Sequence, residues 1–342
     1  MTSTPTANPL QTLLDEQGLF VLDGALATEL ERRGADLKDP LWSAKLLIEQ
    51  PDLIRQVHLD YFLAGADVAT TSSYQATFEA FGKRGYSAEE SADLMRRSVT
   101  LACEARDAFW ANSANRQGRR KPLVAASVGP YGAMLADGSE YIGYQGVSRD
   151  DLARFHAPRL QVLAAAGADL LACETLPCLD EALAIASLLP TLDDGRGHAP
   201  GAWISFSCKD GEHNSQGERI ADCAAALDGL PQVWAVGVNC TAPQYIPSLV
   251  AHIQRHTRTP IVVYPNSGET YDAVDKQWRG ADASAAPAAH TAPCDAFAEA
   301  AMRWHAQGAR LIGGCCRTSP QDIAALKRQA LSQGVLRNVT AP

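Results

Sequence analysis

The sequence predicts a single α/β domain folded as a (β/α)8 TIM barrel, on three observations. Eight short apolar runs alternate with longer amphipathic segments along the 342 residues. A glycine recurs in the turn between an amphipathic segment and the next apolar run. Polar residues or cysteines end the runs, where such a barrel builds its active site. We predict the barrel over residues 11–335, a flexible N-terminal tail over residues 1–10 and a C-terminal tail over residues 336–342.

The apolar runs predict eight strands in chain order. They cover residues 19–22, 67–71, 123–127, 170–174, 203–207, 235–239, 261–264 and 310–313. Apolar residues at helical spacing occupy the intervals, as Ile54, Val57, Tyr61 and Phe62 do before the second strand. Residues 280–293, mostly Ala with Pro, Ser and Thr, are predicted as a loop before the last helix and strand.

Three of the helix-to-strand turns share one device. Gly65, Gly167 and Gly308 each stand where a predicted helix ends and a strand begins. This position favours a left-handed backbone cap, which glycine adopts without steric cost. The repeated turn supports the division of the chain into β/α units.

Composition excludes several classes of partner. With 46% hydrophobic and 20% charged residues, the chain resembles ordinary globular proteins and can bury a large core. A net charge of −9 argues against nucleic acid and anionic membranes, which require clustered Lys and Arg. The one basic cluster, residues 116–121, is predicted as a solvated loop. Nine cysteines without the dense spacing of a secreted scaffold indicate a reducing compartment, so we expect a cytoplasmic protein.

Neither secretion nor membrane insertion is expected. Residues 1–9 are rich in Ser, Thr and Pro and lack the basic start and apolar centre of a signal peptide. No run approaches the roughly 18 uninterrupted apolar residues of a transmembrane helix.

Cysteines end two of the predicted strands. Cys240 follows residues 235–239, and Cys315 and Cys316 follow residues 310–313. Three thiols at two strand ends indicate a metal site, although small core cysteines are the alternative. The separation is too long for a zinc finger, whose ligands come in local pairs, but it suits a barrel that makes distant strands neighbours. A disulfide between Cys315 and Cys316 is disfavoured, because adjacent Cα atoms lie about 3.8 Å apart and a bridge prefers about 5.5 Å. Gly313 and Gly314 would let the backbone approach a bound ion.

Polar groups at the other strand ends would share the same mouth. The complete set is Asp23, Thr71, Glu174, Asn239, Cys240, Asn266, Cys315 and Cys316. Asp23 before Gly24 is equally a turn signal, and Thr71 alone carries little information. Glu174 ends an apolar run, and a carboxylate buried there needs a partner.

Several segments resemble the homocysteine S-methyltransferase family. They are DGALATEL (23–30), DPLWSA (39–44), HLDYF (58–62), AGAD (64–67), TTSSYQ (70–75), CET (173–175), GVNC (237–240) and GGCCRT (313–318). The resemblance runs from about residue 19 to residue 326. The paired Gly-Gly-Cys-Cys with the distant Asn-Cys is its most specific part.

The resemblance implies a zinc ion held by Cys240, Cys315 and Cys316, with a fourth position open for the thiol of homocysteine. A free thiol has a pKa of about 8.5, whereas a zinc-bound thiol is deprotonated and nucleophilic. The resemblance further implies that Asp23 and Glu174 hold the amino group of homocysteine, that Gly24 and Thr71 place its carboxylate, and that Asn239 contacts the substrate or supports its ligands.

The methyl donor is expected to be cationic. Some aromatic rings are expected to face the donor, because aromatic faces attract sulfonium and quaternary ammonium ions. The candidates are Tyr74, Phe78, Tyr131 and Tyr264, and packing in the core is the alternative for each of them. The family includes users of S-methylmethionine or S-adenosylmethionine, users of betaine, and modules of cobalamin-dependent methionine synthases. The DPLWS and SYQA segments look closest to the S-methylmethionine type. We therefore predict S-methylmethionine as donor, with S-adenosylmethionine as a second donor, in a monomer or weak homo-oligomer.

Two rival functions are retained. The same scaffold would serve a methyltransferase for another small thiol or selenol, such as selenocysteine. A non-catalytic thiol or zinc sensor would use the three cysteines but leave Asp23 and Glu174 without a task. The remaining cysteines are predicted to be structural: Cys103, Cys173, Cys178, Cys208, Cys223 and Cys294. Cys173 should point to the opposite face of its strand from Glu174.

Overall fold

Eight parallel strands form one nearly closed sheet in the computed structural model, which describes residues 8–37, 39, 41–268, 270–272, 277–279, 294–337 and 339. The strands are β1 (Phe20–Val21), β2 (Val68–Thr70), β3 (Leu123–Val128), β4 (Leu170–Leu176), β5 (Ala202–Phe206), β6 (Val233–Asn239), β7 (Ile261–Tyr264) and β10 (Ala309–Ile312). Their order is β1-β10-β7-β6-β5-β4-β3-β2, and a parallel bridge between Leu22 and Val68 closes the ring. All eight predicted strands and the TIM barrel are confirmed.

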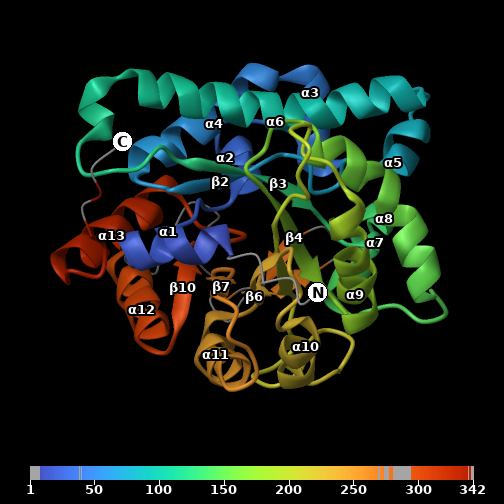
Figure 1. Cartoon of the computed structure of the whole chain (residues 1–342). Coiled ribbons are helices and arrows are strands. Elements are labelled where there is room, and N and C mark those ends of the chain that lie inside the picture. Colours follow the sequence, from blue (N-terminus) through green and yellow to red (C-terminus); the bar gives the residue numbers. More distant parts are fainter. Residues whose placement is uncertain are drawn as a thin grey trace.

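Helices surround the sheet, with the long α6 crossing one side of the barrel (Figure 1). The α-helices are α1 (Pro9–Gln17), α2 (Leu26–Arg32), α3 (Leu46–Glu49), α4 (Pro51–Ala64), α5 (Phe78–Gly82), α6 (Ala88–Ala111), α7 (Tyr131–Leu135), α8 (Arg149–Ala164), α9 (Leu179–Leu188), α10 (Ile220–Leu227), α11 (Ile246–Gln254), α12 (Cys294–Ala306) and α13 (Pro320–Ser332). Short 3-10 turns are η1 (Trp42–Lys45), η2 (Ser113–Arg116), η3 (Ser139–Tyr141), η4 (Leu189–Thr191) and η5 (Pro243–Tyr245).

The turn glycines adopt the predicted left-handed backbone. Their φ angles are +116° at Gly65, +93° at Gly167 and +121° at Gly308. One pair of strands was not predicted: β8 (Thr270–Asp272) and β9 (Gln277–Arg279) form an antiparallel hairpin apart from the barrel. The predicted loop over residues 280–293 lies outside the described residues.

The core is divided by the sheet into two parts. Outward-facing side chains pack against the helices in one large cluster that includes Cys173. Inward-facing side chains form a second cluster inside the barrel, to which Leu10 and Leu14 of α1 belong. Helix α1 therefore packs its apolar side chains on the barrel interior, and the opposite end of the barrel is left for the site.

Both predicted domain boundaries differ slightly from the structure. Helix α1 begins at Pro9, and Leu10 is buried, so these residues belong to the barrel and not to a tail. Leu336 is also buried, and Arg337 donates hydrogen bonds to the carbonyls of Asp15 and Gln17. Leu10 shares helical spacing with Leu13 and Leu14, so the predicted boundary fell inside helix α1, whereas Leu336 lies beyond the last helical period of α13.

A buried carboxylate ties the second strand to its surroundings. Asp67 accepts hydrogen bonds from Gln17 Nε2 at 3.0 Å, from the Val21 amide at 3.1 Å and from Lys327 Nζ at 2.8 Å. Arg119 lies 3.5 Å from the same carboxylate. The segment 116–121, predicted as a solvated loop, is thus partly anchored on the barrel, because its Arg119 reaches a buried charge.

Replacement of Asp67 by Asn should lower the free energy of unfolding by about 3 kcal/mol, because the Lys327 ammonium would remain beside a neutral partner in a buried site. Urea unfolding followed by circular dichroism measures this change. Asp93→Asn, which breaks an exposed pair with Arg96 on α6, is the matched control and should cost less than about 1 kcal/mol. Equal effects of the two substitutions would contradict the role of Asp67.

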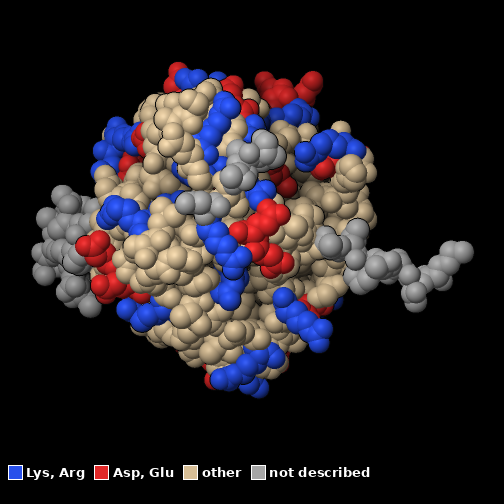
Figure 2. Space-filling view, turned by 60° about the vertical axis from the view of Figure 1, so that its left-hand side comes forward, with Lys and Arg blue, Asp and Glu red and all other residues tan. Residues whose placement is uncertain are grey.

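The surface shows mixed charge. Lys and Arg side chains are interspersed with Asp and Glu on the face in Figure 2. Among the described residues, no helix combines the length and the hydrophobicity that crossing a membrane requires.

Candidate metal centre and substrate pocket

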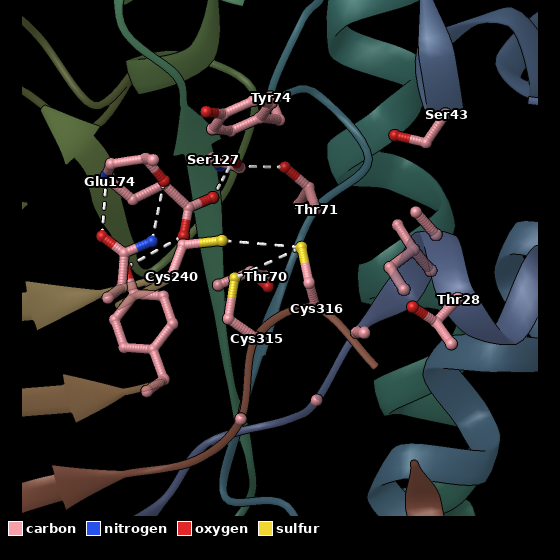
Figure 3. Close-up of a pocket in the computed structure, with 18 of the residues that line it drawn as sticks. Thr28, Ser43, Thr70, Thr71, Tyr74, Ser127, Glu174, Cys240, Cys315 and Cys316 are labelled. Atoms are coloured by element: carbon pink, nitrogen blue, oxygen red, sulfur yellow. Dashed lines mark hydrogen bonds between the residues drawn. The ribbon is translucent and has the colours of Figure 1, made fainter. Parts of the chain in front are cut away.

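Three thiols converge at the carboxyl ends of two strands. Cys240 directly follows β6, and Cys315 and Cys316 follow β10. The Sγ atoms of Cys240 and Cys316 lie 3.5 Å apart, and those of Cys315 and Cys316 lie 4.0 Å apart. All three sulfur atoms lie within 4.8 Å of one another and point toward a common centre (Figure 3). The fold therefore brings the three predicted ligands together, although β7 lies between the strands β6 and β10 that carry them.

The sulfur spacing fits a tetrahedral metal site. Zinc–sulfur bonds of about 2.3 Å at tetrahedral angles place sulfur atoms about 3.8 Å apart. The two distances given above lie on either side of that value. Three thiols and no buried lysine or arginine line the pocket, so the donor set suits a soft divalent cation such as zinc.

The backbone around the thiols is unusual. Cys240 has a φ of +46°, and Arg317, next to Cys316, has a φ of +68°. Non-glycine residues adopt this region rarely and at some cost, which is typical of functional sites. Gly313 and Gly314 serve close packing: a Cβ atom would lie 2.6 Å from the Asp23 carbonyl oxygen at Gly313 and 2.2 Å from Thr318 Oγ1 at Gly314. These glycines bring β10 against β1 and so set the position of the cysteines.

The cluster favours one thiolate even without a cation. Hydrogen bonds from Cys315 and Cys316 hold the pKa of Cys240 well below the usual value for a thiol. The pKa values of Cys315 and Cys316 are raised, chiefly because each donates its proton to Cys240. Tyr141, a residue missed from the sequence, places its hydroxyl 3.3 Å from Cys240 Sγ. A cation bound here would release the remaining thiol protons.

A layer of polar side chains lies just inside the mouth. Successive inward positions change from apolar to polar near the end of each strand, as from Ala172 to Glu174 and from Trp203 to Ser205. The layer comprises Thr70, Ser127, Glu174, Ser205, Asn239 and Tyr264. The alternation that fills the barrel therefore also supplies the polar floor of the pocket.

Glu174 is the central carboxylate of this layer. It is buried, and it accepts hydrogen bonds from the Ser127 hydroxyl and, at 2.9 Å, from the Tyr264 hydroxyl. Burial raises its pKa to about 7, against the lowering effect of the two hydrogen bonds, and negative charge on Cys240 raises it further. The structure offers Glu174 no cationic partner in its described part. The site thus holds a carboxylate whose charge a substrate cation would stabilise.

The raised pKa of Glu174 predicts a pH dependence of stability in the metal-free protein. The folded state binds this proton more tightly than the unfolded chain, so stability is lost as the pH rises from about 4.5 through about 7. Glu174→Gln should remove part of that loss and stabilise the metal-free protein at pH 8 by roughly 1–3 kcal/mol, with little gain at pH 4.5. Urea unfolding at the two pH values measures it. A substitution effect independent of pH would contradict the assignment.

The predicted substrate residues differ in how they meet the pocket. Gly24, Thr71, Glu174 and Asn239 line it, and Asp23 does not. The Asp23 carboxylate accepts hydrogen bonds from the Thr70 amide at 2.8 Å and from the Thr70 hydroxyl at 3.1 Å. Burial raises the pKa of Asp23 well above its usual value. The absence of Asp23 from the pocket lining could not be predicted from its place at a strand end, because the turn after the strand sets the direction of its carboxylate.

Two of the lining side chains are held by the protein itself. The Asn239 amide oxygen accepts from the Thr175 amide at 2.7 Å and from the Ser205 hydroxyl at 2.8 Å. The hydroxyl of Thr71 accepts from the Ser127 amide at 3.0 Å. Asn239 therefore braces the strands around Glu174, and its role toward the substrate stays a prediction.

The aromatic candidates divide evenly. Tyr74 and Tyr264 line the pocket, whereas Phe78 and Tyr131 are absent from its lining. Phe78 packs against the outer core, and Tyr131 makes an edge-to-face contact with Phe155. None of the six cysteines predicted to be structural lines the pocket, and Cys173 lies on the outer face of β4 as expected.

The pocket is a narrow cavity at the mouth of the barrel. Its volume is about 90 Å³, smaller than the roughly 300–1,000 Å³ of typical ligand pockets. Thr28 and Ser43 bound it on the side opposite Glu174 and Ser127, with the thiols between them (Figure 3). The thiols and the central carboxylate thus share one cavity.

The fold and the site define a class: a (β/α)8 barrel with a candidate three-thiol metal site at the carboxyl ends of its strands. A family model described as homocysteine S-methyltransferase matches residues 20–330. The chain belongs to this family of methyltransferases.

Relatives match over nearly the full length of both chains. The chain is 54% identical to homocysteine S-methyltransferase YbgG of Bacillus subtilis, with 95% of this chain and 98% of that protein covered. It is 46% identical to a selenocysteine Se-methyltransferase of Brassica oleracea, with 95% or more of each chain covered. A crystal structure of the homocysteine methyltransferase MmuM from Escherichia coli in its metallated form matches with a TM-score of 0.80 and 48% identity, covering 94% of this chain and all of that one.

Proposed function

We propose that this protein transfers a methyl group from S-methylmethionine, or from S-adenosylmethionine as a second donor, to the thiol of L-homocysteine, and that zinc is its cofactor. The observation that carries the proposal is the meeting of three thiols and a buried carboxylate in one cavity. Relatives at about 50% identity that are named homocysteine S-methyltransferases support the acceptor.

Cys240, Cys315 and Cys316 would hold the zinc, and the bound metal would keep a coordinated acceptor thiol deprotonated at neutral pH. All three cysteines line the cavity, so a zinc ion held by them would be accessible to a substrate thiol there. The lowered pKa of Cys240 favours capture of the cation, because this ligand loses its proton more easily than an ordinary thiol.

Glu174 would bind the ammonium group of homocysteine, with Asp23 adding negative charge behind it. Backbone at Gly24 and the hydroxyl of Thr71 would place the carboxylate of the substrate. The Asn239 brace and the bonds from Ser127 and Tyr264 would keep Glu174 in place while substrates exchange.

The reaction would be a direct displacement. The acceptor sulfur attacks the methyl carbon, a new carbon–sulfur bond forms, and the bond from methyl carbon to donor sulfur breaks with its electrons left on the donor. S-methylmethionine becomes methionine, homocysteine becomes a second methionine, and the thiol proton leaves to solvent. No covalent enzyme intermediate is required.

The setting follows from the same chemistry. All nine cysteines are free thiols, and three must stay reduced to bind a metal, so we propose a reducing compartment such as the cytoplasm. The partners would be the two small substrates. A monomer or weak homo-oligomer stays a prediction.

A competition assay tests the proposal. The zinc-loaded protein is offered homocysteine with S-methylmethionine, S-adenosylmethionine, betaine and methyltetrahydrofolate in one mixture, with each donor labelled differently. Methionine should carry label from S-methylmethionine first, and a chelator should stop the reaction. Zinc bound stoichiometrically without methylation of any thiol would instead support the sensor alternative.

One rival acceptor has an observation in its favour, since a relative at 46% identity is named a selenocysteine Se-methyltransferase. The metal would activate a selenol as well as a thiol. Comparison of kcat/KM for homocysteine and for selenocysteine decides between them, and a higher value for selenocysteine would overturn the proposed acceptor.

A further inference from the structure

We propose that Glu140 is a specificity-determining residue that recognises the positive charge of the methyl donor. This inference rests on the proposed function and adds the residue that selects a cationic donor. It comes from a buried acidic side chain that neither the metal site nor the homocysteine contacts use.

Glu140 lies in the loop between β3 and α8 that reaches the thiols. Its carbonyl oxygen accepts a hydrogen bond of 2.7 Å from the Ser207 hydroxyl at the end of β5. The next residue, Tyr141, lines the pocket and places its hydroxyl 3.3 Å from Cys240 Sγ. A Cβ atom at Gly132 would lie 2.7 Å from the Glu140 nitrogen, so the loop folds tightly on itself.

The loop is held at both ends by one buried residue. Glu181 of α9 accepts a hydrogen bond of 2.6 Å from the Tyr131 amide and another from the Tyr144 hydroxyl. His156 Nε2 lies 2.8 Å from the same carboxylate. Glu140 is therefore carried on a segment fixed to the barrel and not on a free surface loop.

One carboxylate oxygen of Glu140 has no partner among the described residues. Glu140 is 7% exposed, its Oε2 is enclosed without a hydrogen-bond partner, its own backbone amide is the one donor that contacts the carboxylate, and no cation of the described residues pairs with it. A buried carboxylate without a partner is costly, and native proteins pair such groups almost always. A missing cationic ligand accounts for the exception.

The surroundings of Glu140 are negative. Burial raises its pKa to about 7, and the charges of Cys240 and Asp137 raise it further, against the lowering effect of its own backbone amide. Burial and, after it, the charge of Glu140 raise the pKa of Tyr74, which lines the pocket. The complement to this combined field is a cation, and a sulfonium donor carries one at its reacting centre.

The two carboxylates without a cationic partner among the described residues come from different elements. Glu174 projects from the barrel wall, where homocysteine is proposed to bind, whereas Glu140 belongs to η3, next to Tyr141, whose hydroxyl lies beside Cys240 Sγ. A donor that meets the acceptor sulfur must enter between them. We therefore assign Glu140 to the donor and Glu174 to the acceptor.

Glu140→Gln tests the assignment, because it keeps the shape and removes the charge. The KM for S-methylmethionine should rise about tenfold or more, as expected for loss of a charged contact, while the KM for homocysteine and the zinc content stay unchanged. Glu140→Asp should restore part of the donor affinity. Glu212→Gln, which removes the same charge from a half-exposed position in the segment after β5, where Glu212 pairs with Arg219, is the matched control and should leave both KM values unchanged.

Equilibrium binding of S-methylmethionine without homocysteine, measured by calorimetry, separates this inference from the proposed function. If the wild-type protein binds S-methylmethionine and Glu140→Gln weakens that binding, the assignment holds even where turnover fails. Transfer from trimethylsulfonium, which has no ammonium group, identifies the charge: a Glu140 effect there assigns the sulfonium, and an effect confined to S-methylmethionine assigns its ammonium. Unchanged donor affinity in Glu140→Gln, or loss of zinc from it, would overturn the inference.

Discussion

Cys240→Ser is expected to abolish methyl transfer and to lower zinc affinity by more than about 100-fold. Loss of a residue that only supports a metal ligand lowers metal affinity by about 10- to 100-fold, and loss of the ligand itself should cost more. Cys240 has the lowered thiol pKa of the cluster, and both other sulfur atoms lie within 4.8 Å of its own. A serine hydroxyl is a harder and far weaker acid than a thiol, so the site would lose its first charged ligand. Metal content by plasma emission and methionine formation by chromatography measure the two effects.

The control for this experiment is Cys103→Ser. Cys103 is a free, partly buried thiol on α6, outside the pocket lining. It should keep both zinc and activity, and circular dichroism should show the same fold for both variants. Stoichiometric zinc in Cys240→Ser would contradict the metal site and with it the proposed activation of the acceptor.

Glu174→Gln is expected to raise the KM for homocysteine by about ten- to a hundredfold, the range for loss of a hydrogen bond to a charged group. Zinc content should stay near normal, because Glu174 is proposed to contact the substrate and not the metal. Its partners Ser127 and Tyr264 would then bond an amide that attracts no ammonium group. Steady-state kinetics with homocysteine as the varied substrate measure the change.

A substrate analogue sharpens this test. 4-Mercaptobutanoate has the thiol and carboxylate of homocysteine but no amino group. The wild-type protein should bind it about as weakly as Glu174→Gln binds homocysteine, and the substitution should add little further loss. A full additional loss with the analogue, or parallel loss of zinc, would show that Glu174 does not act through the ammonium group.

Much of the architecture was predictable from the sequence because its signals are local. Each strand is one apolar run, and each of the turns at Gly65, Gly167 and Gly308 repeats the same backbone requirement. The cysteines at two of these runs could be placed at one mouth, since a parallel barrel brings all carboxyl strand ends to one side. The family resemblance then named the ion and the substrates that such a mouth would serve.

Other features depended on contacts between distant segments. The direction of the Asp23 carboxylate toward Thr70 and the bracing of Asn239 by Thr175 are set by neighbouring strands. Tyr141 and Glu140 stand in a loop without periodicity, where sequence gives no sign that they approach Cys240. The packing of α1 and Leu336 likewise depends on a barrel that must exist before they can cover it.

The sequence by itself determined the barrel, the order of its strands and the three thiols at its mouth, because the spacing of hydrophobic residues and the identity of each residue are local properties of the chain. Only the tertiary structure decided which polar side chains face the cavity and which form hydrogen bonds between the strands of the barrel. The physical reason is that a buried polar side chain points to the partner that satisfies it, and that partner comes from another part of the chain.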